Sequence, residues 1–191
     1  MNLKNIYIKR LSQVSGIKSL SKLSYYSLNT VIYNVTKQLV RHIIIYKNNG
    51  NRKVVNISDV EHSLRDIKCM KMFMVYDKIK KCGHYMKKSK NNSKNKQMEY
   101  LQKQYECLHI PMLYFSNIIR NIAKEYENKT KFSKESILLL QIAIEDFIIR
   151  LFSDIKRLGN ISGRKVVYPK DVHFIENVLR LPMNPNPDFY H

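Results

Sequence analysis

Two basic nonapeptides of nearly the same sequence carry the most distinctive chemistry of this 191-residue chain. Residues 52–60 read RKVVNISDV and residues 164–172 read RKVVYPKDV, so six of nine positions match at a spacing of 112 residues. In each copy an arginine precedes an aspartate across a turn, where a guanidinium fork on the carboxylate would fix the turn and orient its backbone amides. We therefore expect two loop-fixing pairs: Arg52 with Asp59, and Arg164 with Asp171.

No group of residues in the sequence points to an enzyme. The sequence has no phosphate-cradling Gly-rich loop, no nucleophile elbow and no HExxH motif. Two Cys-x-His triplets, at 82–84 and 107–109, suggest zinc, but this is not the usual ligand spacing and the second triplet falls in a helical segment. We predict no catalytic residue, no metal and no cofactor.

Each nonapeptide follows a long segment with helical periodicity and leads into a short amphipathic helix. The long helices are expected at 23–49 and 133–160. Each would be on the order of 40 Å long, too long for a compact domain made from half the chain. Short helices are expected at 5–14, 58–67, 112–127 and 169–179. The repeating unit, called a module below, is thus short helix, loop, long helix, strand-like loop and short helix.

The ends of these helices carry recognisable signals. Ser133 is placed as an N-cap, and Pro169 suits a first helical turn. Gly50 and Gly163 fall where the two long helices should end. The lengths of the helices around the two nonapeptides repeat as well, which favours one structural device built twice over a chance likeness.

The composition predicts a polyanionic partner. The formal net charge is +19 and the pI is about 9.8, which at this size favours nucleic acid over the rival, a membrane surface. No apolar run reaches the roughly 18 residues of a spanning helix, and the first residues lack the apolar core of a signal peptide. We expect a soluble protein that is not secreted, with its three cysteines reduced.

The two modules resemble the histone fold. Residues 8–65, from IKRLSQVSGIKSLSKLSYYSL to ISDVEHSLR, look like core histone four without a gap. Residues 115–179 look like core histone three, most specifically in AIEDFIIRLF and the PKD loop, and residues 96–108 are similar to that family's extra N-terminal helix. Fusion in this order resembles the histone doublets of large nucleocytoplasmic DNA viruses.

The resemblance implies an all-α chain in which two histone folds form an intramolecular handshake, a pseudo-heterodimer. Neither module has enough core alone, which agrees with that arrangement. The expected domains are 1–67, a histone-four-like fold; 68–95, a basic flexible linker; 96–181, a histone-three-like fold with an extra N-terminal helix; and 182–191, a C-terminal tail. Within 68–103, 11 Lys against Asp77 and Glu99 predict a mobile polycation, and Met72–Tyr76 is a candidate short strand.

A handshake would bring the first loop of each module beside the second loop of the other and offer cations and helix N-termini to the backbone of duplex DNA. The residues expected to bind DNA are Lys9, Arg10, Lys18, Lys22, Arg52, Lys53, Arg120, Lys129, Lys131, Arg164 and Lys165. Binding should be sensitive to salt and nearly blind to sequence. Three positions depart from the family: Ser19, Asn117 and Lys131 stand where it has arginines.

The resemblance also implies protein partners. A second copy of the chain would pack against Leu158, Ile161, Arg164, Asp171 and Phe174, where Leu158 and Ile161 replace the family's Cys and His. A second histone pair would dock at Tyr46, which the family keeps, and at His62, which replaces a Tyr.

The predicted function is therefore that of a histone doublet that wraps duplex DNA, with a second histone pair, into nucleosome-like particles that compact a viral genome. Its expected place is the host nucleus, a viral factory or the virion. One alternative is a histone-fold transcription or adaptor subunit, which should have fewer loop cations. Another is a basic helical RNA-binding protein, although the sequence lacks the aromatic motifs of the common RNA modules.

Overall fold

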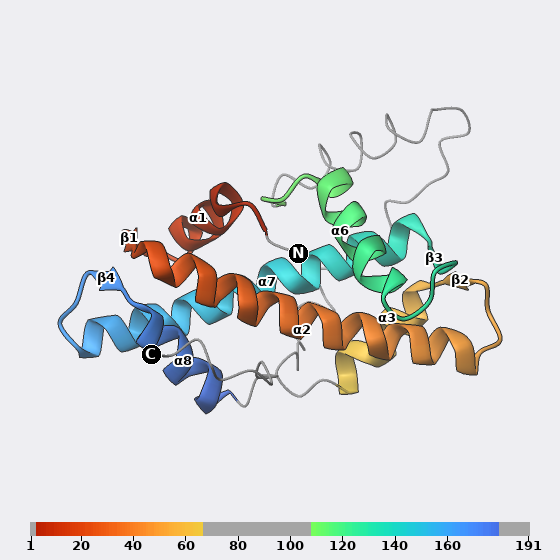
Figure 1. Cartoon of the computed structure of the whole chain (residues 1–191). Helices are drawn as coiled ribbons and strands as arrows, with labels where there is room; N and C mark the ends of the chain where they lie inside the picture. Colours follow the sequence, from red (N-terminus) through yellow and green to blue (C-terminus); the bar gives the residue numbers. More distant parts are fainter. Residues whose placement is uncertain (1–2, 67–107, 180–191) are drawn as a thin grey trace. The chain divides into compact units, whose positions relative to one another are not determined.

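A computed structural model describes residues 3–66 and 108–179 of the chain (Figure 1). Several predictions lie outside these residues: the linker 68–95, the strand Met72–Tyr76, all but the last residue of the extra helix 96–108, the triplet 82–84 and the tail 182–191. The described part is helical apart from short loops and four strands of two residues each. None of its helices combines the length and apolarity that crossing a membrane requires.

The first module has the predicted order of elements. They are α1 (Asn5–Val14), β1 (Ser19–Leu20), α2 (Lys22–Asn49), β2 (Val54–Val55) and α3 (Ile57–Asp66). The backbone amide of Asn56 donates to the Asp59 carboxylate at 2.9 Å. A carboxylate there satisfies an amide at the start of α3 and interacts favourably with the positive end of the helix dipole.

The second module repeats this order. Its elements are α6 (Met112–Lys124), β3 (Lys131–Phe132), α7 (Lys134–Ile161), β4 (Val166–Val167) and α8 (Pro169–Val178). The Ser133 cap is confirmed, because its hydroxyl accepts the amide of Ser136 at 3.1 Å. Helix α6 ends before the predicted residue 127, since the amides of Glu125 and Tyr126 bond to carbonyls three residues back and tighten the last turn.

The turn that follows each long helix has a residue in the left-handed region. In the second module this is Gly163, with φ of 64°, and in the first it is Asn51, with φ of 49°. Helix α2 ends at Asn49, directly before Gly50, as expected. A Cβ on Gly50 would lie 2.6 Å from the guanidinium carbon of Arg52. Gly50 therefore leaves room for that side chain, while Asn51 makes the turn.

The four short strands pair between modules, in parallel. Strand β1 pairs with β4, with Ser19 opposite Val166, and β2 pairs with β3, with Val54 opposite Lys131. In Figure 1 these two ladders appear as β1 beside β4 and β2 beside β3. The first loop of each module thus lies against the second loop of the other, as the handshake predicted.

The compact units of the structure also mix the two modules. Compact unit 1 contains residues 1–38 and 147–191, and compact unit 2 contains residues 39–146. Each unit thus takes the first short helix and the first half of the long helix from one module. From the other module it takes the second half of the long helix and the last short helix.

Each compact unit has its own apolar core. In unit 1 the buried side chains include Leu28, Val31, Ile32, Val35, Ile148, Leu151, Phe152 and Ile155. In unit 2 they include Leu39, Val40, Ile43, Phe115, Ile119, Ile122, Leu140 and Ile144. Full burial of such side chains contributes about 1.5–3 kcal/mol each. Because each set draws on both modules, one module alone would leave much of it exposed.

Candidate nucleic-acid interface

The two predicted Arg–Asp pairs form, as a two-nitrogen fork in the second module and through a single nitrogen of Arg52 in the first. Arg164 donates from both terminal nitrogens to Asp171, at 3.0 and 2.6 Å, and Arg52 hydrogen-bonds and ion-pairs with Asp59. Both carboxylates are buried. The Asp171 carboxylate also accepts the backbone amide of Tyr168 at 2.9 Å, as Asp59 does for its own turn. Each aspartate therefore ties its arginine to the first turn of the next helix.

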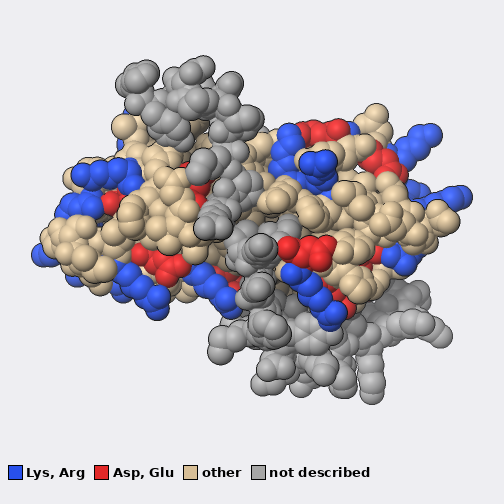
Figure 2. Space-filling model, turned by 90° about the horizontal axis from the view of Figure 1, so that it is seen from below, with Lys and Arg blue, Asp and Glu red and all other residues tan. Residues whose placement is uncertain are grey.

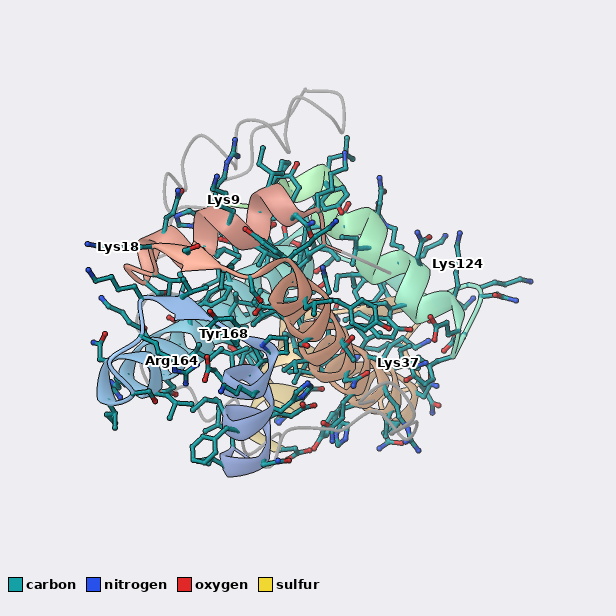
Figure 3. All side chains as sticks on the ribbon, turned by 60° about the vertical axis from the view of Figure 1, so that its left-hand side comes forward. Lys9, Lys18, Lys37, Lys124, Arg164 and Tyr168 are labelled. Atoms are coloured by element: carbon teal, nitrogen blue, oxygen red, sulfur yellow. The ribbon has the colours of Figure 1, made fainter. Side chains whose placement is uncertain are left out.

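These bonds limit what the two arginines can offer a ligand. Both side chains are half-buried, and the hydrogen bonds that Arg164 donates to Asp171 raise the pKa of Arg164 above its usual range. The Tyr168 ring lies 5.7 Å from the guanidinium carbon of Arg164, a distance suited to a cation–π contact. Figure 3 shows Arg164 and Tyr168 near the start of α8. The arginines hold the loops, while the neighbouring Lys53 and Lys165 are exposed.

The β1–β4 ladder brings the predicted cations of compact unit 1 together. Lys18 and Lys22 flank β1. Strand β1 pairs with β4, which directly follows Arg164 and Lys165. The three lysines are exposed, and Figure 3 shows Lys18 projecting from the β1 side. No Asp or Glu precedes Asp59 in the sequence. This loop pair therefore concentrates positive charge from two distant segments.

The β2–β3 ladder does the same in compact unit 2. Lys131 is the first residue of β3, and Lys129 lies just before it. Strand β3 pairs with β2, which directly follows Arg52 and Lys53. All but Arg52 are exposed. This is the second place where cations from both modules meet.

The remaining predicted cations lie on the first short helix of each module. Lys9 and Arg10 are exposed on α1, and Arg120 is exposed on α6, where it donates to the Ser116 hydroxyl at 3.3 Å. Neither helix has a side-chain N-cap or an acidic residue in its first turn. In α3 and α8, by contrast, an aspartate in the first turn accepts the backbone amide of the residue that precedes the helix.

Sequence reasoning missed two features of these loops. The Lys156 ammonium lies against Gly16, 2.6 Å from where a Cβ would stand, and adds a cation to the first loop of compact unit 1. Lys47 is buried and ion-paired with Glu127 in compact unit 2. Spacing could not reveal either contact, because the partners are far apart in the sequence and the helix faces look polar.

An apolar surface lies at the end of α7 and on α8. Ile161 is 85% exposed and Phe174 is 54% exposed, while Leu158 is half-buried. These are three of the five residues expected at the contact between two copies. The other two, Arg164 and Asp171, are bonded to each other and hold the loop beneath.

The two predicted docking residues of compact unit 2 lie together. Tyr46 of α2 stacks on His62 of α3, with ring centroids 5.4 Å apart and planes at 27°. The Tyr46 hydroxyl donates to the carboxylate of Asp66, and this hydrogen bond raises the pKa of Tyr46. The aromatic pair is thereby held in one orientation on the surface.

Other parts of the surface carry mixed charge. Figure 2 shows a face on which Asp and Glu side chains lie among Lys and Arg. Among the described residues, no three His, Cys, Asp or Glu gather as metal ligands would. His109, part of one Cys-x-His triplet, instead lies 3.3 Å from the Glu145 carboxylate, and Cys107 lies outside the described residues.

Comparison with known proteins agrees with this architecture. Residues 85–176 match the histone family model, which describes the domain shared by the core histones. The crystal structure of the histone from Methanopyrus kandleri is similar to this chain, with a TM-score of 0.60 at 14% sequence identity, over 95% of this chain and 97% of that chain. The structural match therefore spans both modules. The chain has the all-α histone fold that its sequence predicted.

Proposed function

We propose that this histone-fold chain is a histone doublet that binds and wraps duplex DNA without sequence specificity. The observation that carries the proposal is the crosswise pairing of loops. It gathers exposed lysines from both modules at β1–β4 and again at β2–β3. Cations beside backbone amides can bind the phosphates of the DNA backbone. Because phosphates are the same at every base pair, such binding does not depend on the DNA sequence.

The proposal extends to the first short helices and to Lys156. The N-termini of α1 and α6 have no side-chain cap, and these helices carry Lys9, Arg10 and Arg120. Both features suit phosphate binding. Lys156 would add a cation to the loop in which Ser19 replaces an arginine. The density of loop cations favours this function over the alternative, a transcription or adaptor subunit acting mainly through protein contacts.

The proposed particle needs more than one chain. A second copy would cover the exposed Ile161 and Phe174, together with Leu158, because apolar surface of this kind favours association. A second histone pair would dock on Tyr46 and His62. We propose that such nucleosome-like particles compact a viral genome in the host nucleus, a viral factory or the virion.

Nuclease digestion tests the proposal. Duplex DNA is reconstituted with the full chain, alone and with a second histone pair, and is digested with micrococcal nuclease. Protected fragments of uniform length are expected, and they should be lost when Lys18, Lys22, Lys129 and Lys131 are all changed to Gln. Digestion to completion at every protein ratio would refute wrapping.

A further inference from the structure

We propose that Lys47 and Glu127 are positioning residues for the DNA-binding loops of compact unit 2. The Lys47 ammonium lies 2.7 Å from each carboxylate oxygen of Glu127. Glu127 stands between α6 and β3, just before Lys129 and Lys131. The inference rests on the proposed function, because it assigns these residues a role in presenting the two loop lysines to DNA.

Lys47 is bonded to both loops that meet at the β2–β3 ladder. Its ammonium holds the first loop of the second module through Glu127, and its backbone carbonyl accepts the amide of Arg52 at 3.1 Å in the second loop of the first module. The backbone of Glu127 in turn links α6 to the turn before β3, because its amide donates to Ala123 and its carbonyl accepts from Thr130. One residue pair thus connects the last turn of α2 to both loops.

Direct contact with DNA does not explain Lys47. Its side chain is only 3% exposed, so its charge is directed to Glu127 and away from solvent, whereas Glu127 is 35% exposed. The hydrogen bonds from Lys47 lower the pKa of Glu127 against the opposing effect of burial, so the carboxylate stays ionised at neutral pH.

Stability alone explains the pair poorly. A buried ion pair often contributes no more to folding than apolar groups of similar volume would, because both charges lose their hydration. What such a pair supplies is one defined geometry, here through two short charge-assisted hydrogen bonds to the same carboxylate. Its effect should therefore appear in the order of the loop and in DNA affinity more than in the free energy of unfolding.

The decisive variant removes the pair without changing the net charge. In the full chain, Lys47→Met and Glu127→Gln are combined, so that neither partner is left as an unpaired charge. Affinity for a duplex of random sequence is measured by fluorescence anisotropy at several salt concentrations. Amide exchange of residues 125–132 is followed by mass spectrometry, and unfolding is measured in urea. Lys47→Arg keeps the charge, and Lys37→Met is the matched control on the same helix.

The double variant should bind DNA about five- to tenfold more weakly, the order expected when one or two residues must be ordered on binding. The slope of log affinity against log salt should stay unchanged, since the same phosphates are contacted. Exchange should rise in 125–132, with little change in the urea midpoint. Lys47→Arg should bind within about twofold of the wild type, the scatter usual for a substitution that keeps the contact, and Lys37→Met should leave exchange in 125–132 unchanged.

Wild-type affinity in the double variant, with unchanged exchange, would overturn the positioning role and leave the proposed function standing. A loss of affinity that only follows a fall in the urea midpoint would also overturn it, because the pair would then be merely structural. Failure of the wild type to bind DNA at low salt would overturn both proposals.

Discussion

The two crosswise loop pairs are built on one plan but anchored by different chemistry. The amides of Ser21 and Ser133, at equivalent positions of the two modules, donate to the carbonyls of Val167 and Val55, both at 3.0 Å. Both loop pairs also have an Arg–Asp ion pair. These shared bonds fix the pairing of the loops in both compact units. The units differ in the bonds that hold the first loop of each module.

The anchors differ at another equivalent position, Ser15 in the first module and Glu127 in the second. The Ser15 hydroxyl donates to the backbone carbonyl of Ile149 at 3.0 Å, a neutral bond to α7. Glu127 instead accepts both bonds from the buried Lys47 of α2. A neutral anchor responds little to pH or salt, whereas an ionic one depends on both partners remaining charged. Compact unit 2 should therefore be the more sensitive end.

The largest effect should come from the feature that both ends share. Arg52→Met and Arg164→Met each leave a buried aspartate without its partner, which we expect to lower the free energy of unfolding by about 3 kcal/mol. Urea denaturation would measure both, with the exposed Lys53→Met and Lys165→Met as matched controls expected to change little. A large loss in one compact unit only would show that the two ion pairs do not contribute equally to stability.

A smaller effect should separate the anchors. Glu127→Gln leaves the buried Lys47 ammonium without a counter-charge and should cost about 2 kcal/mol, while Ser15→Ala removes one neutral hydrogen bond and should cost about 1 kcal/mol. The same urea experiment measures both values. Adding Lys47→Met to Glu127→Gln should restore most of the loss. If Ser15→Ala proved the more damaging change, the proposed difference between the anchors would be wrong.

The turns after the two long helices should differ by less. Gly163→Ala places a Cβ in the left-handed region, where nothing lies within 4 Å, so backbone strain alone should cost about 1 kcal/mol. Asn51→Gly at the equivalent position should change the free energy of unfolding by under about 0.5 kcal/mol, because Asn tolerates this conformation and Gly adopts it freely. Thermal unfolding of the two variants would check this, and equal losses would contradict it.

The smallest effect should be that of acid. Because the folded pKa of Glu127 lies below its usual value of 4.5, the stability that the pair contributes is present above pH 4.5 and is lost as the pH falls through the folded pKa. Amide exchange, corrected for its intrinsic pH dependence, should then rise in 125–132 more than in 15–20. The variant that lacks both Lys47 and Glu127 should show no such difference. Equal responses of both loops in the wild type would contradict an ionic anchor.

The sequence predicted much of this fold because its signals are local. Helical periodicity located all six described helices to within a few residues, and Ser133 and Pro169 marked two starts. The repeated nonapeptide revealed both Arg–Asp pairs, since the partners are only seven positions apart, across one turn. The contacts that it could not reveal are those between distant segments: Lys47 with Glu127, Lys156 with Gly16, and Tyr46 with Asp66.

Side-chain roles were harder to predict than positions. No sequence pattern distinguishes Lys47 from the exposed lysines, yet it is buried, because its partner approaches from the other module. Helix α2 does end directly before Gly50, but the left-handed conformation of the following turn falls on Asn51. In both cases the deciding neighbour, Glu127 or the Arg52 guanidinium, becomes visible only once the loops are placed in space.

The central claim, that both loop pairs bind DNA phosphates, is tested most directly by the salt dependence of binding. Affinity of the full chain for a duplex of random sequence is measured over a range of salt for three variants: Lys18→Gln with Lys22→Gln, Lys129→Gln with Lys131→Gln, and the control Lys37→Gln with Arg41→Gln. Each loop variant should reduce the slope of log affinity against log salt by about 1.8, the value for two lost phosphate contacts, and the control should reduce it far less. Equal slopes for all three variants would contradict the account.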